Sequence, residues 1–188
     1  MSDCNKNDAK VFGIWRWMMT KQVSPLYYAL QNNNTIMADI LIEEGANINM
    51  IYQDTIYKID RETGELAPSV IEETLLHFFL RNNSSLDIIK YLIKHESNLK
   101  LRSTSKGFMK FNLLPLSTAI INRNFKAARY LINLGEGFDI NDNYKYMHYV
   151  CQDDNGVKTV KLLIDKGVDI NSTDNSGTTP LHFACENP

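Results

Sequence analysis

Apolar residues along this chain recur at the spacing of amphipathic helices, and the helices come in pairs. In each group the apolar positions fall on one face of a helix with about 3.6 residues per turn. The groups are Leu26, Ala29 and Leu30; then Ile36, Met37, Ile40 and Leu41; and later Ile88, Ile89, Leu92 and Ile93. The pattern predicts short helix–turn–helix units that are too small to bury their apolar faces alone, so neighbouring units must stack.

These units recur along the chain in a common register. Patterns typical of a helix end and the polar turn after it lie at 40–49, 91–99, 130–141 and 162–171. Patterns typical of a helix start lie at 24–29, 74–77, 115–119, 147–151 and 178–184. Tyr146 and Pro180 occupy equivalent positions about 34 residues apart, close to the period of about 33 residues of one class of helical repeat.

The predicted helix boundaries carry residues that favour them. A hydroxyl residue before a helix accepts a hydrogen bond from an N–H of the first turn, and proline is tolerated at the first helical position. A glycine after a helix adopts the left-handed conformation easily. The hydroxyl residues are Ser24, Thr74 and Thr179; the prolines are Pro25, Pro115 and Pro180; the glycines are Gly45, Gly135 and Gly167.

Several positions depart from the repeated pattern. Glu96 stands where a closing glycine is expected, and a left-handed residue other than glycine costs roughly 1 kcal/mol. Leu114 and Lys145 are poor capping residues before the third and fourth units. Tyr27 and Ser117 stand where later units have histidine. We therefore expect local weakness in the third and fourth units.

The Thr-Pro-Leu-His start at 179–182 and the recurring Gly-x-Asp-x-Asn ending resemble the ankyrin-repeat family. The resemblance extends over residues 23–188 and implies an all-α ankyrin solenoid with β-hairpin fingers. Repeats are expected at about 23–50, 73–99, 114–141 and 145–171, with a partial unit at 174–188. The resemblance also implies that the motif histidines, His77, His148 and His182, hydrogen-bond backbone groups and steady adjacent loops.

Two inserts, 51–72 and 100–113, interrupt the repeat period. Alternating apolar residues around a glycine-bearing turn predict a protruding hairpin in the first insert. In the ankyrin family the finger hairpins lie at these places, beside the concave surface that commonly receives partners, and inserts often mark the binding face. Alternatively, the inserts are unstructured additions. The predicted partner contacts are Tyr52, Tyr57, Arg61, Phe108 and Lys110.

Residues 1–22 form a leader with an unusual aromatic stretch between Val11 and Met19, which includes Trp15 and Trp17. Trp and Arg are frequent in protein interfaces, so this stretch could anchor a partner. A terminal unit of a solenoid must also cover its open core, and we favour the interpretation that the stretch caps the first repeat.

Composition narrows the class of function. Hydrophobic residues make up 44% of the chain and charged residues 22%, as in folded domains, and the net charge of −2 does not favour nucleic-acid binding. No apolar run approaches the roughly 18 residues of a membrane span, and no signal peptide is recognisable. The cysteines, Cys4, Cys151 and Cys185, are odd in number, so we expect reduced thiols and a cytoplasmic location.

Two His-x-x-Cys pairs, His148 with Cys151 and His182 with Cys185, offer the ligand types of a zinc site. They occupy the same register of neighbouring repeats, however, and packed helices lie about 10 Å apart, which is too far for one ion. We therefore expect no metal and no cofactor. Phosphate-binding loops, nucleophile elbows and His-Glu-x-x-His motifs are absent from the sequence, so we predict neither catalysis nor a small-molecule substrate.

The chain is rich in Asn, Ile, Lys and Tyr, and its variant motif at 24–29 is similar to motifs of poxvirus ankyrin proteins. This resemblance implies a protein partner from the host, a location in the host cytoplasm, and a role in innate immunity or host range. Poxvirus members typically end in an F-box-like segment that recruits a ubiquitin ligase, and no such segment occurs in the 188 residues. The chain ends within a repeat's first helix, which suggests a fragment or a truncated product.

Three alternatives to a host-protein blocker are left open. The first is the substrate-binding part of a ubiquitin-ligase adaptor. The second is an ankyrin effector of an intracellular bacterium, and the third is a metal-binding protein.

Overall fold

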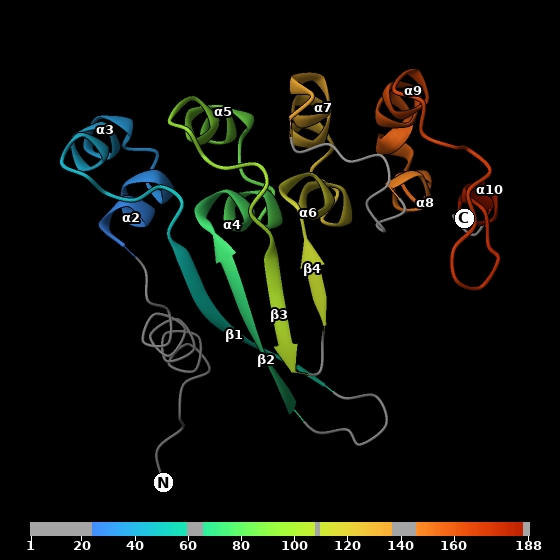
Figure 1. Cartoon of the computed structure of the whole chain (residues 1–188), viewed down its shortest axis with the longest axis horizontal. Coiled ribbons are helices and arrows are strands. Elements are labelled where there is room, and N and C mark those ends of the chain that lie inside the picture. The colour runs from blue at the N-terminus through green and yellow to red at the C-terminus, as the bar shows by residue number, and fades with distance from the viewer. Residues whose placement is uncertain (1–23, 60–65, 108–109, 137–145, 186–188) are drawn as a thin grey trace, which may run out of the picture.

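The computed structural model of the chain describes residues 24–59, 66–107, 110–136 and 146–185, and its helices form two rows (Figure 1). The first row, on the side of the β-sheet, contains α2 (Pro25–Gln31), α4 (Leu75–Arg81), α6 (Pro115–Ile121), α8 (Tyr146–Cys151) and α10 (Pro180–Cys185). The second row contains α3 (Thr35–Glu43), α5 (Leu86–Lys94), α7 (Phe125–Leu134) and α9 (Val157–Asp165), with a short 3-10 turn, Asp154–Gly156, before α9.

Capping of the helices agrees with the sequence in part. The hydroxyl of Ser24 accepts a hydrogen bond from the backbone N–H of Tyr27 at 3.3 Å, as predicted. Thr74 precedes α4 but its side chain accepts no such bond, so that prediction was wrong. Leu114 makes no side-chain cap, as expected, and Lys145 lies outside the described residues.

Left-handed residues end helices in both rows. The predicted glycines, Gly45, Gly135 and Gly167, have φ of 92°, 73° and 83°, and the predicted substitute Glu96 has φ of 65°. A second set after the first-row helices was not predicted: Asn33, Asn83 and Arg123 have φ of 55°, 51° and 59°. Asparagine tolerates this conformation better than most residues, whereas Arg123 occupies it at a cost.

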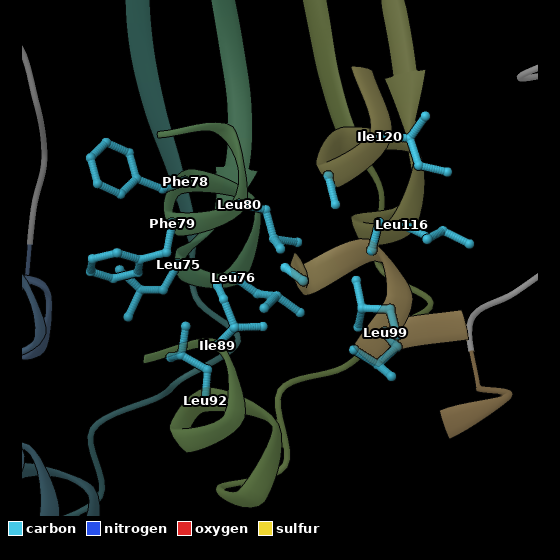
Figure 2. Packing of buried hydrophobic residues seen from close by; sticks show 14 of the residues in the cluster. Leu75, Leu76, Phe78, Phe79, Leu80, Ile89, Leu92, Leu99, Leu116 and Ile120 are labelled. Atoms are coloured by element: carbon cyan, nitrogen blue, oxygen red, sulfur yellow. The ribbon is translucent and has the colours of Figure 1, made fainter. Parts of the chain in front are cut away.

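Among the described residues, a continuous hydrophobic core runs between the two rows of helices. Leu76 and Leu80 of α4, Ile89 and Leu92 of α5, and Leu116 of α6 are no more than 2% exposed. Figure 2 shows the side chains of α4 and α5 clustered on one side of this core and those of α6 on the other. Burying one such side chain contributes about 1.5–3 kcal/mol, so stacking of neighbouring units stabilises the fold.

Both inserts form hairpins, and the hairpins join in one antiparallel sheet of order β1-β2-β3-β4. The strands are β1 (Ile51–Ile59), β2 (Leu66–Thr74), β3 (Ser103–Gly107) and β4 (Phe111–Leu113). The first hairpin agrees with the sequence prediction, although β2 continues to the residue before α4. The pairing of β2 with β3 across two repeats was not predicted.

The fold class needs one correction. The repeat helices are present as predicted, but the four-stranded sheet makes the term all-α only approximate. Among the described helices, none combines the length and the apolar character that crossing a membrane requires.

Candidate protein-binding surface

The four strands, called the finger sheet here, extend away from the helices and present two different faces (Figure 1). On one face Tyr52, Asp54 and Ile71 are at most 4% exposed. On the other face Ile51 is 54% exposed and Gln53 is also exposed. This second face, called the exposed finger face, is therefore the part of the sheet that a partner can reach.

Glu72 of β2 links the two hairpins across the exposed finger face. Its carboxylate accepts hydrogen bonds from Gln53 Nε2 of β1 at 3.1 Å, and from Thr104 Oγ1 and Lys106 Nζ of β3 at 3.2 and 3.1 Å. The Lys106 hydrogen bond is the largest of the influences that lower the pKa of Glu72 below its ordinary value. One carboxylate thus connects three strands.

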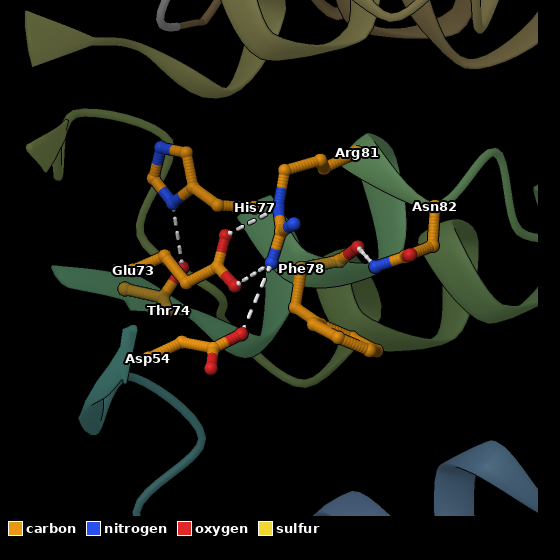
Figure 3. Close-up of polar contacts among 7 residues, drawn as sticks. All are labelled: Asp54, Glu73, Thr74, His77, Phe78, Arg81 and Asn82. Atoms are coloured by element: carbon orange, nitrogen blue, oxygen red, sulfur yellow. Dashed lines mark hydrogen bonds and ion pairs between the residues drawn. The ribbon is translucent and has the colours of Figure 1, made fainter. Parts of the chain in front are cut away.

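An ion-pair cluster holds the base of the first hairpin against α4 (Figure 3). Arg81 donates two hydrogen bonds to Glu73, Nε to Oε2 at 3.1 Å and Nη2 to Oε1 at 2.6 Å, and its Nη2 lies 3.8 Å from Asp54 Oδ2. Burial disfavours the guanidinium charge, but the hydrogen bond and charge of Glu73, with Asp54, outweigh it and raise the pKa of Arg81. The guanidinium also lies 5.7 Å from the centre of the Phe78 ring.

His77 ties α4 to the second hairpin. Its Nε2 lies 3.1 Å from the Leu113 carbonyl oxygen, which can only accept, so Nε2 carries the proton. Its Nδ1, at 2.9 Å, must then accept from the Thr74 hydroxyl. Burial lowers the pKa of His77 to about 4, so the ring is neutral at physiological pH.

The other motif positions repeat parts of this arrangement. His148 Nε2 donates to the Thr178 carbonyl oxygen at 2.9 Å, and His182 Nδ1 lies 2.8 Å from Thr179 Oγ1. Where the histidine is replaced, Ser117 Oγ contacts Tyr146 Oη at 3.3 Å. His77 and His148 therefore hydrogen-bond backbone groups of the next repeat, as the family resemblance implied, whereas His182 contacts Thr179 of its own repeat. The predicted prolines, Pro25, Pro115 and Pro180, are the first residues of α2, α6 and α10.

The structure describes the predicted partner contacts only in part. Tyr52 is 4% exposed and its hydroxyl lies 2.6 Å from Ser24 Oγ, so its selection as a surface contact was wrong. Tyr57 lies in β1 opposite Pro68, and Lys110 is exposed between β3 and β4. Arg61 and Phe108 lie outside the described residues.

Sequence reasoning missed Asp54, Glu73 and Arg81, which position the finger sheet. No local signal identifies Asp54 and Glu73 as buried, because a charged residue in a strand is ordinarily assigned to the solvent face. The available clue was that acidic residues of the insert precede the arginine at the end of the next helix.

Candidates for metal chemistry are sparse in the described chain. Cys151 is half-buried and Cys185 exposed, and burial raises the pKa of the Cys151 thiol. Within the described ranges, no three His, Cys, Asp or Glu side chains gather in a way that could hold a metal ion.

Comparison with known proteins identifies the repeats. Ankyrin-repeat family models match residues 22–52 (one repeat), 57–144 (three copies) and 147–187 (a model described as ankyrin repeats in many copies). The human ASB11 ankyrin repeat domain superposes with a TM-score of 0.57 at 18% identity, over 87% of this chain and 63% of that chain. That likeness concerns the fold alone.

Curated relatives come from viruses and from an archaeon. An ankyrin repeat protein of fowlpox virus is 28% identical over 57% of this chain and 26% of its own length. One of Acanthamoeba polyphaga mimivirus is 29% identical over 80% of this chain and 42% of its own. One of Pyrobaculum aerophilum is 39% identical over 38% of this chain and 27% of its own.

The chain therefore spans less than half the length of these three relatives. The family models together match most of the sequence, and the structure has the stacked helix pairs that the repeats predict. The chain belongs to the ankyrin-repeat family.

Proposed function

We propose that this chain is a non-catalytic module that binds a folded protein partner through the exposed finger face and the neighbouring first-row helices. Ankyrin repeats are generally protein–protein interaction modules. The observation that carries the proposal is the anchoring of the finger sheet: Arg81 and His77 fix its base, and Glu72 links its strands. A surface held in place before binding loses little conformational entropy when a partner docks.

The exposed finger face has the mixed chemistry of a protein interface. Ile51 supplies apolar area beside the polar side chains of Gln53, Glu72 and Lys106. Lys110 and Tyr57 remain proposed contacts on the same hairpins, as do Arg61 and Phe108. Apolar area surrounded by polar groups is typical of interfaces between proteins that also exist alone.

A host-cell protein is the proposed partner, and the host cytoplasm is the proposed location. The support is that the fowlpox and mimivirus relatives align with 57% and 80% of this chain, whereas the archaeal relative aligns with 38%. Modulation of innate immunity or host range is the corresponding proposed role.

The test compares three forms of the full chain immobilised in host-cell extract. One is unaltered, and the finger variant combines Ile51→Glu with Lys110→Glu. The control variant combines Ile170→Glu with Lys166→Glu, which makes the same chemical changes at an exposed isoleucine and lysine away from the fingers. Circular dichroism verifies that all three are folded, and mass spectrometry identifies what each retains.

We expect a protein that the unaltered chain and the control retain and the finger variant loses by about tenfold or more. Equal retention by both variants would remove the exposed finger face from the proposal. If ligase subunits are retained together with that partner, the adaptor interpretation replaces a simple blocking role.

A further inference from the structure

A groove of about 1200 Å³ crosses three consecutive repeats on the side of the helices away from the fingers. It is lined by the turns that connect first-row to second-row helices, at 83–87, 123–126 and 153–158, together with Arg129 and Lys161. The finger strands join α4 and α6 at their first residues, whereas these turns follow their last residues. The groove, called the turn groove here, is therefore a surface distinct from the exposed finger face.

Positive charge gathers in the turn groove although the chain as a whole has a net charge of −2. Five basic residues line it, against three aspartates. Arg123 is paired with Asp153 at 3.2 Å, and Arg129 Nη1 donates to the Thr159 hydroxyl at 3.2 Å. In the part of the chain that the structure describes, Lys126, Lys158 and Lys161 form no ion pair with a carboxylate.

The basic residues follow the repeat. Lys126 and Lys158 are the second residues of α7 and α9, and Arg129 and Lys161 are the fifth residues of the same helices. Because α7 packs against α9, equivalent residues lie about 10 Å apart. The turn groove therefore presents two rows of cations at a fixed spacing.

Asn124, at the wall of the groove, has an unused hydrogen-bond donor. Its Oδ1 accepts from the Ala127 backbone N–H at 3.3 Å, but its Nδ2 has no partner and the residue is only 4% exposed. It precedes α7, whose N-terminal end carries partial positive charge. The helix end and the lysines favour an anionic ligand.

We propose that the turn groove binds an acidic segment of a partner protein. In a segment with polyproline II conformation there are three residues per turn, so residues three apart lie on the same face about 9 Å from each other, and carboxylates at every third position match the Lys126 and Lys158 spacing. Because three aspartates lie among the cations of the groove, ligand charges spaced to meet Lys126 and Lys158 fit it better than the continuous charge of a phosphate backbone. Phe125 is 5% exposed and offers no ring for base stacking, which disfavours nucleic acid further.

The test measures fluorescence anisotropy of a labelled peptide of about twelve residues, with glutamate at every third position among proline and serine, which favours the polyproline II conformation. A peptide of the same composition with its glutamates contiguous tests the spacing, and a single-stranded oligonucleotide of equal charge tests the other class of ligand. The groove variant is Lys126→Glu with Lys158→Glu. The matched control is Lys94→Glu with Lys166→Glu, two exposed lysines outside the groove with the same change in net charge.

We expect the spaced peptide to bind the unaltered chain at low salt, with a loss of about tenfold or more in the groove variant and about twofold or less in the control. The finger variant should bind this peptide with the affinity of the unaltered chain, so this result does not depend on whether the exposed finger face binds a partner. The proposal is overturned if the spaced peptide does not bind, or if the groove variant and the control variant weaken its binding equally. It is also overturned if the contiguous peptide binds as tightly as the spaced peptide. Tighter, groove-dependent binding of the oligonucleotide also overturns it.

Discussion

At the scale of single residues, His77 shows how one side chain joins two repeats. Its ring accepts from Thr74 next to its own helix and donates to the Leu113 carbonyl just before the next first-row helix. The arrangement requires a neutral ring, because a protonated Nδ1 cannot accept from the Thr74 hydroxyl. Burial maintains this state by lowering the pKa of His77 to about 4.

A pH dependence of stability follows. The folded-state pKa of His77 lies below the ordinary value of 6.5, so the unfolded chain binds more protons once the pH falls below about 6.5. The contribution of neutral His77 is complete above that pH and declines by about 3 kcal/mol as the pH approaches 4, below which it levels off. Urea unfolding of the unaltered chain and of His77→Gln, at several pH values between 7 and 4, measures this decline in the contribution of His77.

Other titrating groups are the same in both chains, so the difference between their free energies of unfolding isolates His77. We expect the unaltered chain to lose its advantage over His77→Gln as the pH falls. A difference that stays constant from pH 7 to pH 4 would show that His77 is not held neutral by the fold.

At the scale of elements, the finger sheet separates what local sequence can predict from what it cannot. The helix pairs and the first hairpin were predictable, because the periodicity and the turn residues that specify them lie within each segment. The pairing of β2 with β3 was not, since it depends on how neighbouring repeats stack. Glu72 of β2 finds Thr104 and Lys106 only after that stacking is complete.

The faces of β1 were also unpredictable from local pattern. Asp54 is buried and Ile51 is 54% exposed, the reverse of the usual preference. The inversion depends on Arg81, which α4 supplies as a counter-ion to the buried carboxylates. The selection of Tyr52 as a contact failed for the same reason: strand alternation indicates two faces but does not say which one the fold covers.

Removing the guanidinium tests this account of the finger base. In Arg81→Met, Asp54 and Glu73, which are 3% and 2% exposed, lose their counter-ion. We expect a loss of about 2–4 kcal/mol in the free energy of unfolding, less than for a fully buried pair because Arg81 is itself 24% exposed. Hydrogen exchange should increase in β1 and β2. The comparison is Arg123→Met, which removes a 62% exposed arginine paired with Asp153 and should cost at most about 1 kcal/mol.

Equal stability of the two methionine variants would mean that the ion pairs at the finger base contribute no more than a surface pair. The exposed finger face would then have no special anchoring, and the physical basis of the proposed binding function would be weakened.

At the scale of the whole molecule, stability should vary along the row of repeats. In a solenoid each unit contacts only its neighbours, so a central unit is stabilised from two sides. Helix α6 contacts both α4 and α8, whereas among the described elements α10 contacts α8. Burial follows this difference: Leu116 of α6 is 2% exposed, and Leu181, its equivalent in α10, is 71% exposed.

These two leucines offer a matched test, since each is the second residue of its helix after a proline. Leu116→Ala leaves a cavity in the centre of the core, and we expect a loss of about 2–5 kcal/mol with faster amide exchange in α4 and α8 as well as α6. Leu181→Ala removes a mostly exposed side chain, so the loss should stay within about 1 kcal/mol and the exchange change within the last repeat. Chemical unfolding followed by hydrogen exchange distinguishes the two, and a similar effect of both substitutions would contradict a core that is strongest at its centre. A central core of this kind supports both proposed binding surfaces, because the first hairpin and the turn groove each attach to the helices of the middle repeats.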